Sequence, residues 1–321
     1  MKAKNCLIFG GTGQIGTNLI RKLAKNNYKV IVVTRNLHQK GNFIKTQANA
    51  GFIEIIEANP FDEKSISPLL KKSDICINLI GILFEKGKNN FKNIHVNFPS
   101  YLSTLCKDNN IKQLIHISAL GVEKAHDSKY AQSKLEGENN IKKIFNEATI
   151  LRPSVVYSID DNFTTMFMKL ITKFPIFPLY YNGNTKFMPI HCSDLTDVIV
   201  RVLNKEIKSE IIECGGQEII SLKEIIQILM DLINKKRFLL PMPLIFANLM
   251  AKILEVLPYP LLTSDQLKLL KYDNVFSNNF KNNLDIGVPS KKFFREEVKK
   301  YCYMWRDGGQ FSTEKYLSDN K

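Results

Sequence analysis

Two side chains suited to acid–base chemistry lie one helical turn apart in the stretch "SKYAQSKLEGE", residues 128–138. Side chains four residues apart project from one face of a helix, so we expect Tyr130 and Lys134 to be neighbours. A tyrosine phenol ordinarily ionises with a pKa of about 10. A nearby ammonium and a bound ribose would lower this pKa and make Tyr130 an acid–base catalyst. Because this spacing also arises by chance, the pair indicates a site only beside a cofactor-binding motif.

A glycine-rich segment near the N-terminus supplies such a motif. The chain reads "CLIFGGTGQIG" from Cys6, with a glycine at every third position. An apolar run precedes the glycines and a helical pattern follows them, which is typical of a dinucleotide-binding turn. We expect a diphosphate at the start of this helix, where free N–H groups attract anions; the alternative is a glycine turn without a ligand. The expected binding residues are Gly10, Thr12, Gly13, Gln14, Ile15 and Gly16.

The end of the second predicted strand indicates which dinucleotide binds. An acidic residue there binds the ribose of NAD, whereas a basic residue accommodates the 2′-phosphate of NADP. The chain reads "VVTRN", which places Arg35 nineteen residues after Gly16 with no acidic residue close in sequence. The sequence therefore favours NADP(H) and leaves NAD(H) as the alternative. An exposed arginine with no ligand would give the same pattern.

Strands and helices that could hold these residues alternate through the first half of the chain. Apolar runs predict buried strands at 6–9, 29–34, 52–57, 74–80, 112–118 and 149–153. Helical patterns lie between them at 14–26, 62–72, 91–109 and 128–146. This alternation predicts an α/β fold, a Rossmann-type doubly wound parallel sheet covered by helices on both faces.

The alternation loosens after Pro153, where a smaller, mostly helical C-terminal part is expected. A helix near 193–204 and a strand near 211–214 are its clearest elements. We place a boundary near residue 155. Residues 1–155 would form the NAD(P)-binding domain, and residues 156–321 a closely packed part that binds substrate or a partner.

Composition excludes several classes of protein. The 321 residues are 44% hydrophobic and 24% charged, as in ordinary folded proteins. The net charge of +14 indicates either an acidic partner, such as a phosphate cofactor or an anionic membrane, or compositional drift. Nucleic acid is not expected, because the basic residues are scattered without an arginine-rich patch.

The compartment follows from the cysteines and the hydropathy pattern. The six cysteines lie far apart without metal-binding spacing, so we expect a reducing compartment and no metal site. The N-terminus leads almost directly into a strand, which leaves no room for a signal peptide. No long uninterrupted apolar run predicts a transmembrane helix. These features predict a cytoplasmic protein.

The segment "PLIFANLMAKILEVLP", residues 243–258, is apolar except for one narrow stripe formed by Asn248, Lys252 and Glu255. A helix of this length is too short to span a bilayer. It is either buried in the C-terminal part or is a face that docks on a membrane or a large partner. Thr263 followed by Gln266 predicts a capping box for the next helix.

Three further histidines are considered as candidate site residues, and a structural role is expected for each. His191 and Asp194 are close enough in sequence to form an acid–base pair, but we expect Ser193 or Asp194 to cap the helix that follows. His95 and His116 flank apolar positions and are expected to be core or edge histidines with satisfied hydrogen bonds.

The motifs together resemble the extended short-chain dehydrogenase/reductases. The matching segments are "GGTGQIG", Asn97 in "HVNFPS", "HISALG", the Tyr130–Lys134 pair and "ILRPSVVY". The resemblance implies that Tyr130 transfers a proton, Lys134 binds the nicotinamide ribose and Ser118 orients a substrate carbonyl. It also implies cofactor contacts from Asn59, Leu79, Ile80, Gly81 and Pro153.

Residues 161–199 and 257–277 resemble a narrower, atypical branch of this superfamily. That branch contains the nucleotide-binding accessory subunits of respiratory NADH:ubiquinone oxidoreductase (complex I) and their bacterial relatives. The resemblance implies tight NADP(H) binding without established turnover. It also implies respiratory complex subunits as partners and a peripheral position on the inner face of a respiratory membrane, with contact through 243–258.

Two departures from the family pattern separate binding from catalysis. Ser118 precedes Tyr130 by only twelve residues, a segment too short for the usual substrate loop. Asn59 stands where the family has an aspartate, although an amide can still donate to adenine. Two functions therefore remain: a subunit that holds NADP(H), or an NADPH-dependent reductase or epimerase of a small metabolite.

Overall fold

The computed structural model describes residues 3–49, 51–257 and 260–309. Its centre is an eight-stranded sheet with the order β14-β11-β6-β5-β4-β1-β2-β3, in which every pair is parallel. The strands are β1 Asn5–Phe9, β2 Lys29–Thr34, β3 Ile53–Glu57, β4 Ile75–Asn78, β5 Gln113–Ile117, β6 Thr149–Pro153, β11 Ile211–Cys214 and β14 Lys281–Asn282. The predicted doubly wound α/β fold is confirmed.

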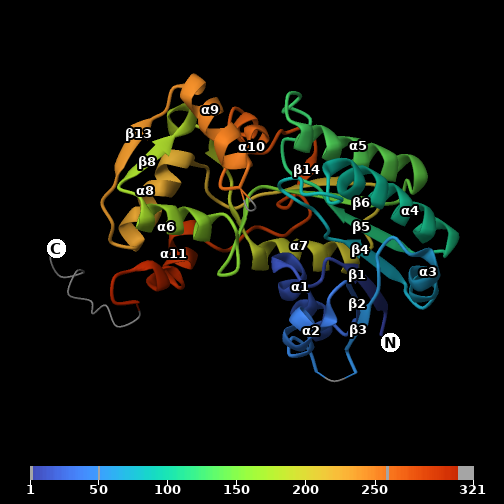
Figure 1. Cartoon of the computed structure of the whole chain (residues 1–321). Coiled ribbons are helices and arrows are strands. Elements are labelled where there is room, and N and C mark those ends of the chain that lie inside the picture. The colour runs from blue at the N-terminus through green and yellow to red at the C-terminus, as the bar shows by residue number, and fades with distance from the viewer. Residues whose placement is uncertain (1–2, 50, 258–259, 310–321) are drawn as a thin grey trace.

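Helices cover both faces of this sheet (Figure 1). One face packs against α1 (Gln14–Lys25), α2 (Leu37–Lys45) and α7 (Cys192–Asn204). The other packs against α3 (Glu63–Lys71), α4 (Phe98–Asp108) and α5 (Lys129–Ile144). The central strands β1, β2, β4 and β5 are therefore largely buried on both sides, as the uninterrupted apolar runs predicted, whereas the edge strands β3 and β14 carry exposed polar residues.

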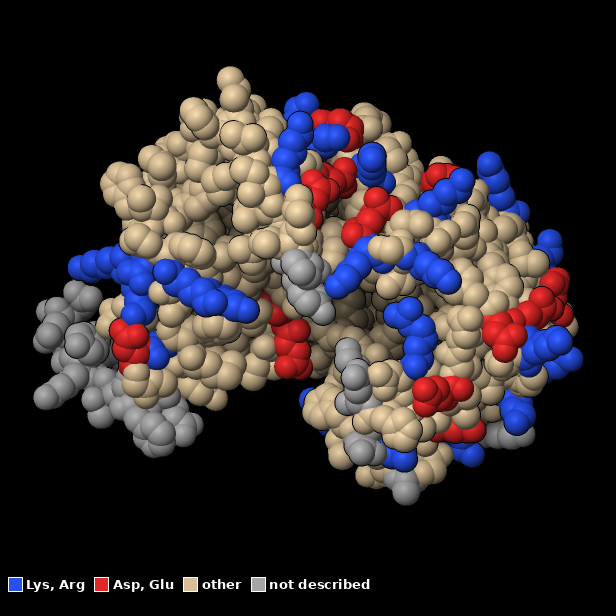
Figure 2. Space-filling view, viewed as in Figure 1, with Lys and Arg blue, Asp and Glu red and all other residues tan. Residues whose placement is uncertain are grey.

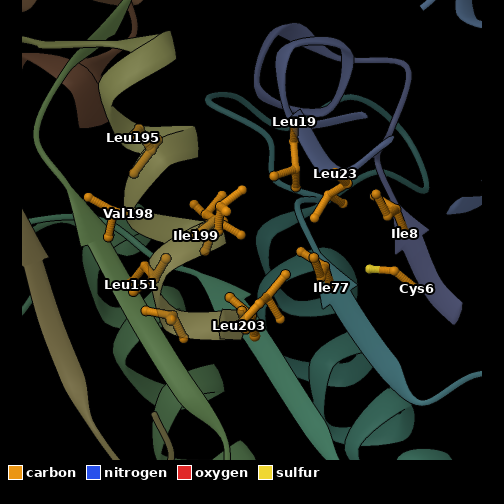
Figure 3. Close-up of a cluster of buried hydrophobic side chains, with 14 of the residues drawn as sticks. Cys6, Ile8, Leu19, Leu23, Ile77, Leu151, Leu195, Val198, Ile199 and Leu203 are labelled. Carbon is orange, nitrogen blue, oxygen red and sulfur yellow. The ribbon is translucent and has the colours of Figure 1, made fainter. Parts of the chain in front are cut away.

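Side chains alternate between the two cores along each strand. On β1, Cys6 and Ile8 face the α1–α7 side, whereas Leu7 and Phe9 face the α3–α5 side. Figure 3 shows the first of these cores, in which Leu19 and Leu23 of α1 meet α7 side chains above the sheet. This packing fixes the start of α1 against the end of β1, where the glycine turn lies.

A second group of elements surrounds its own core after residue 155. Its short sheets pair β7 with β10, β9 with β12 and β8 with β13. The strands are β7 Val156–Tyr157, β8 Ile176–Leu179, β9 Lys186–Phe187, β10 Ile190–His191, β12 Ile220–Ser221 and β13 Phe238–Pro241. The helices are α6 Thr164–Lys173, α8 Leu222–Leu232, α9 Leu244–Glu255, α10 Ser264–Leu269 and α11 Phe294–Lys299, with 3₁₀ turns at Tyr180–Gly183 and Cys302–Trp305.

The chain passes between the two groups more than once. Helix α7 and strands β11 and β14 all follow residue 155 in sequence, yet they complete the main sheet and its helical cover. The division near residue 155 stays a prediction about domain boundaries.

The helix predicted at 91–109 is divided. A π-helical turn, η1 (Lys92–Asn97), precedes α4. Pro99 near the start of α4 has no N–H to donate to the carbonyl of His95, which interrupts the regular ladder. That carbonyl lies against α5 instead: a Cβ on Gly137 would be 1.9 Å from it. The π turn therefore allows α5 to pack closely beside His95.

Candidate functional site

In the glycine turn after β1, close packing requires glycine at Gly10 and Gly16, whereas Gly13 has open space beside its backbone. Gly10 has a φ of +78°, and a Cβ there would lie 3.0 Å from the backbone of Leu79. A Cβ on Gly16 would lie 2.4 Å from the Cα of Gly11. In contrast, a Cβ on exposed Gly13 would meet no atom closer than 3.4 Å. The open side of Gly13 is where a ligand can approach the backbone.

The start of α1 leaves its backbone N–H groups available. Gly13 is the N-cap residue and provides no side-chain cap, and the first turn has no acidic residue. Such a helix start attracts an anion, and this arrangement fits the diphosphate of a dinucleotide. The side chain of Gln14 points across the site and donates to Ser158 Oγ at 2.9 Å. Ile15 packs on the α1–α7 core, and Thr12 is half-buried in the turn.

Residues 79–81, after β4, lie between the glycine turn and Lys134. The N–H of Leu79 donates to the carbonyl of Phe9, and the N–H of Ile80 donates to Asn78 Oδ1 at 3.0 Å. On the other side, a Cβ on Gly81 would lie 3.2 Å from Lys134 Nζ. The fold therefore brings together the turn, this connection and the helix that carries Lys134.

Lys134 is a buried cation at the centre of this arrangement, with 4% of its surface exposed. Its ammonium donates to the carbonyl of Ile117 at 3.1 Å. An ammonium has three N–H donors, so further bonds to ribose hydroxyls are compatible with this geometry. Burial lowers the pKa of Lys134 to about 8, with a smaller opposing effect from Glu138.

Tyr130 is held by two aromatic neighbours. Its ring makes edge-to-face contacts with His95, at a centroid distance of 5.3 Å, and with Phe91, at 5.8 Å. Burial raises the pKa of Tyr130 to about 12. The expectation that Lys134 lowers this pKa is wrong for the protein alone, because desolvation of the phenolate dominates.

His95 connects the loop after β4 with the tyrosine helix. Its Nε2 accepts from the N–H of Ile82 at 3.1 Å, and its Nδ1 lies 2.9 Å from Ser133 Oγ. Because Ser133 Oγ donates to the carbonyl of Tyr130 at 2.7 Å, Nδ1 is the donor and the ring is neutral. Burial and Lys134 lower the pKa of His95 to about 2. The predicted satisfied core histidine is confirmed, and it also supports both sides of the candidate site.

Two buried polar atoms near the end of β5 have no partner among the described residues. They are Ser118 Oγ and His116 Nε2. His116 Nδ1 accepts from the amide of Asn78, whose Oδ1 is already bonded to Ile80, so Nε2 carries the proton. The expected satisfied histidine is therefore wrong for His116. An unpartnered buried hydroxyl at Ser118 fits a ligand bound at this position.

A carboxylate that the sequence analysis missed lies near Arg35. Arg35 is exposed just after β2, and its neighbour Thr34 pairs with Glu57 of β3. The Glu57 carboxylate accepts from the N–H of Leu37 at 3.4 Å. Sheet register therefore places an acid near Arg35, although 22 residues separate them in sequence. Asn59 is exposed, and its Oδ1 accepts from the N–H of Phe61. Its side-chain N–H₂ group is therefore the part of the amide that could donate to a ligand.

The remaining predicted positions lie at the ends of β6 and β10. Pro153 ends β6, and its carbonyl accepts from the N–H of Leu120 at 2.9 Å. Helix α7 is capped by His191, whose Nδ1 accepts from Ser193 N–H at 3.2 Å. Asp194 instead accepts from the N–H groups of Lys291 and Lys292. The predicted cap by Ser193 or Asp194 is therefore wrong.

A segment of the C-terminal part, residues 263–274, covers the short connection between Ser118 and Tyr130. We call it the strap. Its Leu269 and Tyr272 pack on the cluster that contains Val122 and Ala125. Asn274 Nδ2 donates to the carbonyl of Leu120 at 2.8 Å. The strap begins with the predicted capping box of Thr263 and Gln266, which is confirmed.

A cavity of about 310 Å³ lies beside the strap. Its lining includes Phe91, Lys129, Glu255, Thr263 and Asp265.

No group of three or more His, Cys, Asp or Glu in the described part of the chain is arranged to hold a metal ion. None of the helices formed by the described residues is both long and apolar enough to cross a bilayer.

The parallel sheet, the glycine turn and the uncapped helix define a Rossmann-type α/β protein. A model of the NAD dependent epimerase/dehydratase family matches residues 6–215, and the chain belongs to this family. The structure resembles dTDP-glucose 4,6-dehydratase of Streptomyces venezuelae, solved with NAD bound, with a TM-score of 0.71 and 17% identity over 94% of this chain and 96% of that one. This likeness concerns the fold.

Curated relatives are similar over most of their length. NADH dehydrogenase (ubiquinone) 1 alpha subcomplex subunit 9 of Arabidopsis thaliana is 26% identical over 94% of this chain and 78% of that protein. The NADH-ubiquinone oxidoreductase 40 kDa subunit of Neurospora crassa is 25% identical over 88% and 74%. The resemblance to complex I accessory subunits, predicted from residues 161–199 and 257–277, is thereby confirmed.

Proposed function

We propose that this protein holds NADP(H) in a structural or assembly role within a membrane-associated respiratory complex, with little or no turnover. The observation that carries this proposal is the strap. The connection from Ser118 to Tyr130 is short, and the strap packs on it and bonds to Leu120. The side on which a substrate would be held is thus covered by the protein itself.

Nucleotide binding is supported by the residues that the fold brings together. The open N–H groups of α1 suit a diphosphate, and Lys134 suits ribose hydroxyls. A nicotinamide dinucleotide supplies hydride-transfer chemistry when it is bound; the residues described here bind and orient it. The names of the relatives support a respiratory assembly as the partner.

A preference for NADP(H) over NAD(H) is proposed from Arg35. The guanidinium would pair with a 2′-phosphate, whereas Glu57 nearby is engaged by Leu37 N–H. We expect the purified protein to bind NADPH more tightly than NADH, and Arg35→Glu to remove the difference. Arg295→Glu, a change at another exposed arginine, is the matched control. Equal affinity of the wild type for both dinucleotides would contradict the assignment.

An alternative function is supported by one further observation. Ser118 Oγ is buried without a partner close to the Tyr130–Lys134 helix, as in a site that orients a carbonyl. This geometry favours a reductase or epimerase acting on a small metabolite. Steady oxidation of NADPH with a defined metabolite, lost in Tyr130→Phe, would establish this alternative and overturn the holding role.

A peripheral membrane contact is proposed from the exposed side of α9, β8 and β13. Helix α9 buries only its small residues Ala247 and Ala251 against its neighbours, and Ile245 is 82% exposed. Of the two alternatives for residues 243–258, burial in the C-terminal part is wrong for most of the large apolar side chains of α9. The exposed residues of this apolar surface are Phe174, Ile176, Phe238, Leu240, Leu244, Ile245, Phe246, Leu249, Ile253, Val256 and Leu257. Position 258, at the end of the predicted segment, lies outside the described residues.

The apolar surface is free of charged residues except at the C-terminal end of α9, where exposed Lys252 and Glu255 lie among Ile253, Val256 and Leu257. Strands β8 and β13 pair in parallel, and β13 leads directly into α9. No charged residue occurs in 174–185 or 238–251, while Lys173, Arg237 and Lys252 border these stretches. Figure 2 shows no charged side chain on the visible face over α9, β8 and β13, at the upper left. Apolar residues bordered by cations suit the interface of an anionic bilayer.

A further inference from the structure

We propose that Asp265, on helix α10 of the strap, is a positioning residue for the dinucleotide site and acts through α5. The inference rests on the proposed nucleotide binding and adds a contact that controls it. Asp265 is 136 residues from Lys129 in sequence, yet its Oδ1 accepts from the N–H of Lys129 at 2.7 Å. Its Oδ2 accepts from the N–H of Tyr130 at 2.9 Å and from the hydroxyl of Ser128 at 2.8 Å.

These bonds account for the first turn of α5. Ser128 is the N-cap residue, and its hydroxyl accepts from the N–H of Ala131 while donating to Asp265. The N–H groups of residues 129, 130 and 131 are therefore all satisfied by Asp265 or by the Ser128 that it holds. A carboxylate at this end of a helix also interacts favourably with the helix dipole.

The carboxylate is fixed from the C-terminal part of the chain. The reciprocal capping box of Thr263 and Gln266 orders the first turn of α10. Leu267 is buried against α9 beside Ala247 and Ala251. Lys268 adds a second bond to the start of α5, because its Nζ donates to the carbonyl of Asp127 at 3.0 Å.

The capped turn is the one that presents the candidate site. Tyr130 belongs to this turn, and Lys134 follows one turn later beside Gly81. If the cap is lost, the first turn of α5 frays, and a dinucleotide must then order it on binding. Asp265 therefore raises nucleotide affinity by keeping the turn formed in advance, and a bound nucleotide in turn stabilises the strap by linkage.

The test compares two carboxylates of the strap. Asp265→Ala removes the carboxylate that holds the first turn of α5, whereas the control Asp273→Asn changes a carboxylate that accepts from the N–H of Lys186, outside α5. We expect Asp265→Ala to raise the Kd for NADPH on the order of fivefold, the equivalent of a typical helix cap. Asp273→Asn should leave this Kd unchanged, and Asp265→Asn, which keeps one acceptor, should lie between.

A second measurement does not require the alanine variant to fold. Amide hydrogen exchange in the wild-type strap, residues 263–270, should slow when NADPH is added, and Ser128→Ala should weaken this effect. Unchanged exchange in the strap, or a lowered Tm in Asp265→Ala with an unchanged Kd, would overturn the positioning role alone. A wild type that binds neither dinucleotide would overturn the proposed function as well.

Discussion

Gly13 and Gly16 differ in what surrounds them, although both belong to one motif. Gly16 touches the backbone of Gly11, so its missing side chain serves packing between helix and strand. Gly13 is exposed and faces open space, so the proposed diphosphate can approach its backbone. The motif thus combines a folding requirement with a binding requirement.

We expect substitutions at these two glycines to separate stability from binding. Gly16→Ala should lower the free energy of unfolding by about 1–3 kcal/mol, because α1 must move away from the turn. Gly13→Ala should change it by less than about 1 kcal/mol but abolish NADPH binding. Thermal unfolding and NADPH titration of both variants check this. Retention of nucleotide by Gly13→Ala would argue against the diphosphate site.

The depressed pKa of Lys134 predicts a pH dependence of stability. In the unfolded chain this lysine has its ordinary pKa of 10.5, whereas burial lowers the pKa to about 8 in the folded protein. Between these values the unfolded state binds more protons, so this residue makes folding more favourable as pH rises. The free energy of unfolding of the wild type, relative to Lys134→Met, should increase from pH 7 to pH 10. A constant difference would show that Lys134 is solvated.

The positions of individual residues were predicted correctly from sequence where they depend only on spacing along one helix or turn. The glycines and the Tyr130–Lys134 pair lie where local periodicity placed them. Glu57 and Asp265 were missed, because sheet register and a contact over more than a hundred residues bring them to the site. The raised pKa of Tyr130 was also missed, since burial is a property of the whole fold.

Among the elements, buried strands were the most predictable. The strands 29–34 and 149–153 match β2 and β6 at both ends, because continuous apolar runs mark strands covered on both faces. Helix α2 was not predicted, since "LHQKGNFIK" lacks an apolar stripe and contains a glycine. The 91–109 helix was predicted without its π turn, which arises where Pro99 has no N–H to donate and which lets α5 pack closely at Gly137.

Helix α9 shows the limit of amphipathic patterns. Its burial depends on two alanines, while most of its large apolar side chains, which the sequence could place either in a core or on a docking face, are exposed. The sequence of a helix alone does not show whether its apolar face packs against the rest of the protein or against a membrane or partner. The capping box at the start of the strap was predicted from its residues, but the contacts of the strap with α5 were not.

We expect charged substitutions on the apolar surface to abolish membrane contact without unfolding the protein. Ile245→Asp and Ile253→Asp change residues that are 82% and 62% exposed. Both should reduce binding to vesicles of phosphatidylcholine and phosphatidylglycerol at least tenfold, since a charge must enter the interface. Leu284→Asp, at a 56% exposed residue outside this surface, is the control. Vesicle sedimentation with unchanged binding by all three variants would contradict the membrane contact.

Over the whole molecule, the α/β sheet and the C-terminal part share the candidate site. Gln14 reaches Ser158, and Asp265 reaches the start of α5, so both parts contribute to the surroundings of the proposed nucleotide site. The net charge of +14 suits both an anionic cofactor and an anionic membrane. Neither partner can be assigned from charge alone, because the basic residues are scattered.

A holding role predicts that the tyrosine hydroxyl is dispensable. Tyr130→Phe keeps the ring contacts with His95 and Phe91 and removes only the phenolic oxygen. We expect this variant to retain NADPH and to assemble with its partners as the wild type does, whereas Lys134→Met releases the nucleotide. Co-purification and nucleotide content of both variants provide the check. Failed assembly of Tyr130→Phe that still carries nucleotide would contradict the role assigned here.

The central claim is that the protein holds a dinucleotide within a respiratory assembly. Its most direct test is isolation of the wild-type protein from native membranes, with mass spectrometry of the co-purified proteins and of the bound nucleotide. We expect NADH dehydrogenase subunits and close to one NADP(H) for each chain. A free protein without respiratory subunits, which oxidises NADPH with a metabolite, would contradict the claim.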